Sequence, residues 1–155
     1  LKVYITGGSD VHEHGTSNRS YGNGRTMIYA NSMRSEDLIK GLHAGHNAVA
    51  ASGSSTFAEI NIKDAMMGDT LLVDPFEEAL VLTIQMVIKV PSLLRVFNQE
   101  GCIFEERCEL GLSHEVSQIL PKHNTFVIVE LWQYDFDNTL YNPYFTNPIF
   151  IDKKY

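Results

Sequence analysis

The stretch ALVLTIQMVIKV, residues 79–90, decides the fold, because every even-numbered position in it is apolar. The odd-numbered positions include Gln85 and Lys89. Successive side chains of a β-strand point to opposite faces of a sheet, so a period of two predicts a long, half-buried strand, which Pro91 ends. A slip of one residue would expose the whole apolar set. We therefore expect the even positions from Leu80 to Val90 to be buried and Gln85 and Lys89 to be exposed.

Short β-like segments separated by turn signals lie on both sides of this strand. Many such segments in one chain are typical of two packed sheets. The sequence therefore predicts a mainly β protein with an antiparallel, immunoglobulin-like β-sandwich. The expected strands are NAVAAS (47–52), FAEINI (57–62), LLRVFN (93–98), CIFEER (102–107), EVSQIL (115–120), TFVIVELW (125–132) and a last strand within YNPYFTNPIFI (141–151).

The only tryptophan, Trp132, lies in the expected strand 125–132 among aromatic and β-branched neighbours. We expect it to be largely buried between the sheets, with its indole N–H hydrogen-bonded, because a buried indole needs an acceptor. Glu130 is unusual in such an apolar strand, and we expect it to pair with a lysine or an arginine.

The first third of the chain has a different pattern. KVYIT (2–6) and TMIYA (26–30) are expected strands, and SEDLIKGLHAG (35–45) is the one convincing helix. Ser35 is expected to cap the start of this helix and Gly45 to end it. Its apolar face is expected at Leu38, Ile39 and Leu42.

The composition limits the class of protein. A chain of 155 residues, 44% of them hydrophobic, is long enough for one domain with a buried core. A net charge of −7 argues against a nucleic-acid partner, because binding to phosphates needs basic patches. No stretch is long and apolar enough to span a bilayer, and the first residues lack the pattern of a signal peptide. We expect a cytoplasmic protein with no nucleic-acid or membrane partner.

The two cysteines, Cys102 and Cys108, are six residues apart, a spacing that matches no common zinc motif. In one hairpin they could face each other and form a disulfide. A reduced pair is the favoured state for a cytoplasmic protein.

The stretch GGSDVHEHG, residues 7–15, places Asp10, His12 and His14 at alternate positions. In an extended chain these three side chains share one face. A carboxylate together with neutral imidazoles suits zinc, iron or manganese. The alternative is a polar loop whose histidines are exposed and bind nothing.

Several motifs, taken in order along the chain, resemble the C-terminal part of PHP (polymerase and histidinol phosphatase) type metal-dependent hydrolases. The resemblance is to the subgroup with an appended β-sandwich. It runs through GSDVHE (8–13), YGNGRTMIYA (21–30), SEDLIKGLHAGHNAVAASG (35–53), MGDTL (67–71) and TNPIFI (146–151).

The resemblance implies a role for several residues. Asp10 and His12 match the last ligand pair of the family, an S-D-x-H motif at the end of a barrel strand. His14 matches no ligand of the family and is only a candidate extra ligand. Arg25 is a candidate anion-binding residue, in a stretch that usually reads Gly-x-Pro-Arg-Thr and has Gly24 in place of the proline. Residues 1–45 would be the remnant of the barrel, a short segment with one α-helix, and residues 46–155 the sandwich domain.

DVHEH also fits the D-x-H-x-H motif with which the same family opens. A barrel start should be followed by alternating strands and helices. Here one helix is followed by about a hundred residues of β pattern, so the C-terminal alignment is favoured. His43 and His46 lie at the end of the helix. When protonated, they are expected to interact favourably with its negative terminus rather than to bind a metal.

Two functions follow from these expectations. In the first, the chain is the C-terminal fragment of a metal-dependent phosphoesterase that uses zinc, manganese or iron on a small-molecule substrate. Because this chain supplies only one metal motif, it would be inactive alone and would need the missing N-terminal catalytic part or another chain. The alternative is a self-standing β-sandwich that binds or assembles, with a homo-oligomer as one form.

Overall fold

The computed structural model describes residues 2–8, 24–51, 56–74, 76, 79–120 and 126–154. This part of the chain is mainly β, with two sheets and one helix, as the sequence predicts. Its elements in chain order are β1 (Arg25–Ile28), α1 (Ser35–Ala44), β2 (Asn47–Ala50), β3 (Phe57–Ile62), β4 (Ala65–Met66), β5 (Thr70–Val73), β6 (Leu80–Ile88), β7 (Ser92–Asn98), β8 (Gly101–Cys108), β9 (Gly111–Leu120), β10 (Phe126–Tyr134), β11 (Leu140–Thr146) and β12 (Ile149–Lys153).

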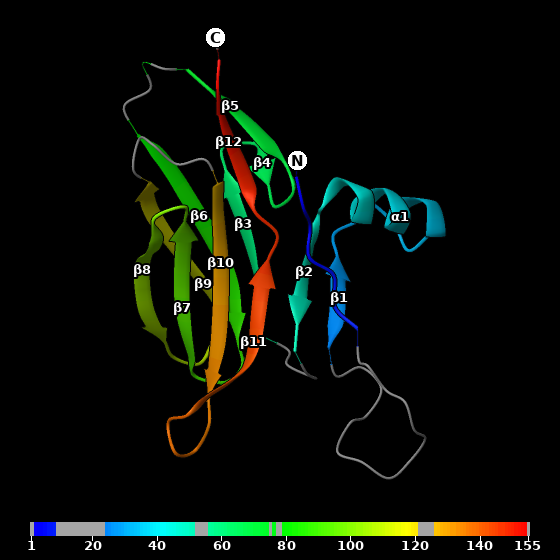
Figure 1. Cartoon of the computed structure of the whole chain (residues 1–155). Helices are drawn as coiled ribbons and strands as arrows, with labels where there is room; N and C mark the ends of the chain where they lie inside the picture. The colour runs from blue at the N-terminus through cyan, green and yellow to red at the C-terminus, as the bar shows by residue number, and fades with distance from the viewer. Residues whose placement is uncertain are drawn as a thin grey trace.

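The larger sheet has eight strands in the order β1-β2-β11-β10-β12-β5, and β7 joins it by pairing with β10 and with β8. The smaller sheet has the order β4-β3-β6-β9. The two sheets lie against each other, and β1, β2 and α1 stand together at one side of the molecule (Figure 1). The expected antiparallel arrangement holds for every described pairing except β12 with β5, which is parallel. β5 and β12 are far apart in the sequence, so no hairpin turn forces them to run in opposite directions.

β6 has the alternation that its sequence predicts. Leu82, Ile84, Met86 and Ile88 are almost completely buried, and Gln85 and Lys89 are exposed, as expected. The expectation is wrong for Leu80 and Val90, at the start of β6 and beyond its end, which are only half-buried. Hydrogen bonds to β3 on one side and β9 on the other make β6 a central strand of the smaller sheet. Burying this face against the larger sheet forms the core, to which β10 adds Val127, Val129 and Leu131.

The expected position of Trp132 is wrong. Leu131 faces the core, and because neighbouring side chains alternate, Trp132 lies on the outer face of the larger sheet and is only half-buried. Its indole N–H is hydrogen-bonded, as expected, and the acceptor is Glu130 Oε2 at 2.9 Å. Glu130 thus accepts from the indole in place of the expected lysine or arginine, and the Trp132 ring packs edge-on against Phe145, with the ring centres 5.9 Å apart.

α1 begins one residue earlier than expected, because Ser35, the expected N-cap, is already part of the helix. Arg34 is the N-cap, without a side-chain hydrogen bond, and Ser35 is the first helical residue. Gly45 ends the helix in the left-handed conformation, with φ 76°, as predicted. The expected apolar face is only partly correct, because Ile39 is 55% exposed. The buried residue of the helix is Gly41, whose Cα approaches the backbone oxygen of Tyr29 too closely to leave room for a Cβ atom.

The tail forms two strands where one was expected. β11 and β12 are separated at Asn147 and Pro148, where the ladder must break because proline has no backbone N–H to donate. β11 pairs with β2 and β10, whereas β12 pairs with β10 and β5.

Other expectations concern the boundary near residue 45 and the cysteines. β1 pairs with β2 and so lies in the same sheet as strands that follow residue 46, and the division into 1–45 and 46–155 stays a prediction.

Cys102 is exposed, Cys108 is buried, and neither is in a disulfide. In the described part of the chain, no helix has the length and hydropathy needed to cross a bilayer.

Candidate functional site

The predicted metal residues Asp10, His12 and His14 lie outside the described residues, so their role stays a prediction. The described part of the chain contains no cluster of three or more histidine, cysteine, aspartate or glutamate side chains that could hold a metal. The structure does describe the two segments that flank the motif. Residues 2–8 lead into it, and β1 follows it.

Residues 2–8 were expected to include a strand, but they form an extended segment without a described strand partner. Their backbone bonds to side chains instead. The Ile5 N–H donates to Asn147 Oδ1 at 2.8 Å, and the Ile5 carbonyl accepts from Asn47 Nδ2 at 2.7 Å. Asn47 and Asn147 are both fully buried, so these bonds hold the segment on the sandwich at a site closed to water.

The end of this segment is joined to the start of β1. The Gly7 N–H donates to Thr26 Oγ1 at 2.9 Å, and the same hydroxyl is 3.0 Å from the Gly7 carbonyl, to which it donates. One threonine side chain therefore satisfies both backbone groups of Gly7. The chain thus enters and leaves residues 9–23 at neighbouring points beside β1 and β2, which Figure 1 shows next to the segment.

Tyr4 fixes the middle of the segment. Its hydroxyl donates to the carbonyl of Gly68 at 3.0 Å, and its ring lies so close to Gly45 that a Cβ atom there would be 2.4 Å from it. The neighbouring side chains point the other way: Val3 is 67% exposed and Ile5 is 40% exposed. One face of the segment therefore contacts the sandwich, and an apolar face remains open.

Arg25 is the one predicted site residue that the structure describes. It begins β1 opposite Ala50, is half-buried, and its Nε atom is inaccessible to solvent. Gly24 precedes it with φ 74°, a left-handed conformation that proline cannot adopt. The departure from the Gly-x-Pro-Arg-Thr pattern thus goes with a different backbone at this position. An anion-binding role for Arg25 stays a prediction.

His46 has a partner that sequence reasoning missed. Its Nε2 atom is 2.8 Å from Asp69 Oδ1, and Asp69 Oδ2 accepts from the Met66 N–H at 3.0 Å. The carboxylate orients the imidazole, as in sites where a histidine binds a proton or a metal. Each residue directly follows a glycine, Gly45 or Gly68, but a separation of 23 residues gives no local signal of their contact. His43 lies exposed in the last turn of α1, and its interaction with the helix end stays a prediction.

Comparisons of this chain with protein-family models, curated proteins and solved structures find no match. Family membership therefore stays a prediction from the motifs. The structural observation closest to the predicted metal motif is the set of hydrogen bonds and contacts that hold residues 2–8 on the sandwich.

Proposed function

We propose that this chain is the C-terminal part of a PHP-type metal-dependent hydrolase that acts on phosphoesters. Asp10 and His12 contribute ligands to a metal site that further motifs complete, from a catalytic part of the same protein or from another chain. Arg25 binds the anionic group of a small-molecule substrate. This function rests on the ordered motifs and on one structural observation, the two-faced packing of residues 2–8.

Strands of parallel barrels are covered on both faces and are therefore apolar on both. In residues 2–8, Tyr4 contacts the sandwich, whereas Val3 and Ile5 form an apolar face that no described residue covers fully. The segment therefore has the side-chain pattern of a barrel strand, in which one face is packed and the other face is open to a second layer of structure. A barrel that adds this layer would place residues 9–12 at the end of one of its strands, where chemistry occurs in such folds.

The donor set fits a divalent ion in part. A carboxylate and an imidazole are suitable ligands for zinc, manganese or iron, but catalytic zinc sites use three protein ligands. His14 is the nearest candidate for a third. When bound in a completed site, the ions would supply Lewis-acid polarisation of the phosphoryl group and activation of a water molecule. The role of this chain is to hold Asp10 and His12 in place through the bonds of Ile5 and Gly7.

A self-standing binding module is the second candidate. It is favoured by an apolar cavity that is lined by residues of β1, β2, β3 and β11, by Tyr29 directly after β1 and by Met67 in the turn before β5.

Calorimetric titration with zinc and with manganese tests the first proposal. We expect one weak site that disappears in Asp10→Ala/His12→Ala and remains in His43→Ala, a matched control in which an exposed histidine outside the motif is removed. His14→Ala shows whether a third ligand takes part. Identical binding by all four proteins would overturn the metal role of the motif.

A further inference from the structure

A cavity of about 150 Å³ lies at the edge of the sandwich, between β3 and the β1–β2 end of the larger sheet. β4 pairs with Asn61 and Ile62, so among the described residues the first half of β3 has no strand partner on that side, which leaves room for the cavity. An apolar cavity of about this volume accepts a group the size of benzene. Five separate parts of the chain line it, so it forms only when these parts of the sandwich are assembled.

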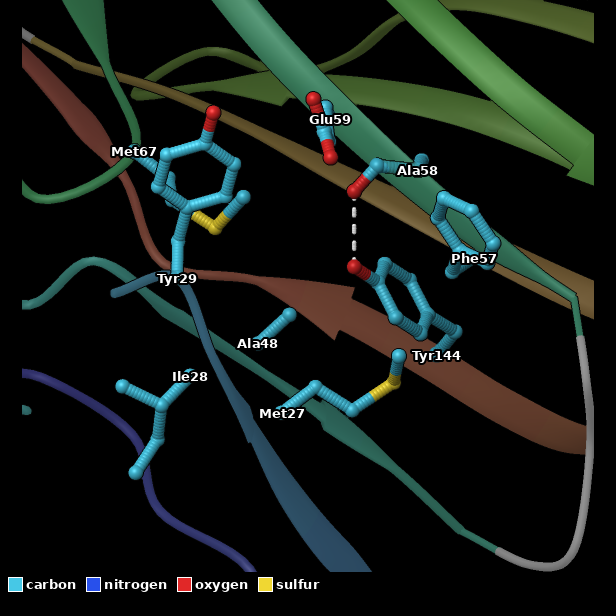
Figure 2. Close-up of a pocket in the computed structure, with 9 residues that line it drawn as sticks. All are labelled: Met27, Ile28, Tyr29, Ala48, Phe57, Ala58, Glu59, Met67 and Tyr144. Carbon is cyan, nitrogen blue, oxygen red and sulfur yellow. Dashed lines mark hydrogen bonds between the residues drawn. The ribbon is translucent and has the colours of Figure 1, made fainter. Parts of the chain in front are cut away.

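Three aromatic rings surround this cavity, those of Tyr29, Phe57 and Tyr144 (Figure 2). Tyr144 is 3% exposed, and its hydroxyl donates to the carbonyl of Ala58 at 2.7 Å. That bond uses the hydroxyl and fixes the ring. Tyr29 is 51% exposed, so its ring lies at the opening of the cavity.

Two thioethers and one carboxylate complete the wall. Met27 and Met67 present soft, polarisable sulfur atoms beside the rings. Glu59 lies at the rim, and no lysine, arginine or histidine is among the described residues that line the cavity. In the described part of the chain, the Glu59 carboxylate has no hydrogen bond or ion pair. The charge of this wall is therefore negative.

The aromatic rings and the carboxylate together favour a ligand with a positive charge. The faces of aromatic rings are negative and attract cations, and a nearby carboxylate strengthens that attraction where little water is present. An anion is repelled by Glu59. A bare metal ion finds too few oxygen or nitrogen ligands here, and an unmethylated ammonium would lose hydrogen bonds to water that rings and thioethers cannot replace. A cation with apolar substituents satisfies both the charge and the lining.

We propose that this cavity binds a small alkylated ammonium compound that is free in solution. The methyl groups of the ligand lie against Tyr29, Phe57 and Tyr144, and its positive charge lies beside Glu59. The site adds a binding function to the proposed hydrolase. It does not depend on that proposal.

NMR of the full chain with ¹³C-methyl methionine tests the site, with choline as the probe. Choline is expected to shift the methyl signals of Met27 and Met67 in a saturable way, and to leave the signal of Met33, which is 88% exposed, unchanged. The matched neutral probe is 3,3-dimethylbutan-1-ol, which has the shape of choline without its charge. We expect choline to bind at least tenfold more tightly, a difference of about 1.4 kcal/mol.

Two isosteric variants separate the local charge from the net charge. Glu59→Gln is expected to reduce the preference for choline to less than twofold. Glu115→Gln removes the same charge from an exposed position two strands away in the same row of the smaller sheet, and should keep the preference. Asp10→Ala/His12→Ala should leave choline binding unchanged, which separates this test from that of the metal motif. Equal affinity for the two probes, or no shift of Met27 and Met67 at saturating choline, would overturn the proposal.

Discussion

At the scale of single residues, Asn147 joins three distant parts of the chain. Its Oδ1 atom accepts from the Ile5 N–H, its Nδ2 donates to the Gly45 carbonyl at 3.1 Å, and its backbone N–H donates to the Asn47 carbonyl at 3.2 Å. The side chain is fully buried, so water cannot replace these bonds. Residues 2–8, the end of α1 and the start of β2 are therefore held together by one residue, through its side-chain amide and its backbone N–H.

Asn147→Ala should lower the free energy of unfolding by about 1 to 3 kcal/mol, because it leaves the Ile5 N–H without its acceptor and removes one of the two donors to the Gly45 carbonyl, which keeps its bond from the Asn47 N–H. Urea denaturation followed by circular dichroism measures this change. Asn31→Ala, at an exposed position, should change the free energy by no more than about 0.5 kcal/mol. Equal effects of the two substitutions would contradict the role given to Asn147.

Cys108 gives the stability of the protein a pH dependence. Burial raises the pKa of the Cys108 thiol from 9.0 to about 11, and the carboxylates of Glu106 and Glu109 add to this effect. Between these two pH values the unfolded chain loses the proton and the folded chain keeps it. Stability is therefore full below pH 9 and falls as the pH rises toward 11, by roughly 2 to 3 kcal/mol in total.

Urea denaturation at pH 8 and at pH 11 measures this loss, and Cys108→Ala should make it smaller. Part of the loss should remain, because burial also raises the pKa of Tyr144 above its usual value. A pH profile of Cys108→Ala identical to that of the wild type would show that the thiol does not contribute. The two thiols should also differ in reactivity: at pH 8 the exposed Cys102 should react with a disulfide reagent, and Cys108 only after unfolding.

At the scale of elements, β6 ties the smaller sheet to the core. Ile84 is fully buried and lies opposite Ile60 of β3 and Val116 of β9. Ile84→Ala should lower the free energy of unfolding by about 2 to 5 kcal/mol, since it removes buried methyl groups and leaves a cavity. Val81→Ala, on the other face and 47% exposed, should cost less than about 1 kcal/mol. Similar losses for both variants would contradict the alternation of β6.

Elements with a clear period were predictable from sequence, and the others were not. β6 has polar residues on one face only, so its inner face can be assigned. The segment 126–132 is apolar on both faces apart from Glu130, so the sequence does not say which set faces the core, and Trp132 was assigned to the wrong side. Residues 2–6 have the composition of a strand, but side chains of distant residues take their backbone bonds.

At the scale of the whole molecule, contacts between distant residues decide what the sequence can reveal of the sites. Asp10 and His12 can be proposed as ligands from sequence because a carboxylate and an imidazole two residues apart form a local motif. The pair of His46 and Asp69, and the cavity beside Glu59, arise only when separate elements meet. Residue type alone gave no signal for either.

The isolated chain should not hydrolyse phosphoesters above background with added manganese or zinc, because Asp10 and His12 cannot hold a cluster of two or three ions. Release of nitrophenol from bis(p-nitrophenyl) phosphate measures this. Turnover that survives purification and is lost in Asp10→Ala would show that the chain, alone or as an oligomer, has a complete site.

Thermal melting with equimolar zinc tests the central claim, that residues 10–12 form half of a metal site, most directly. Free zinc at 100 times the dissociation constant of a complete site would add about 2.7 kcal/mol to the free energy of unfolding. This corresponds to a rise in Tm of roughly 5 to 10 °C for a chain of this size. For two ligands we predict a rise below about 3 °C at equimolar zinc, a larger rise at millimolar zinc, and neither in Asp10→Ala/His12→Ala. The rises should fade below about pH 6, where His12 is protonated. Equal melting of wild type and variant at millimolar zinc would contradict the claim.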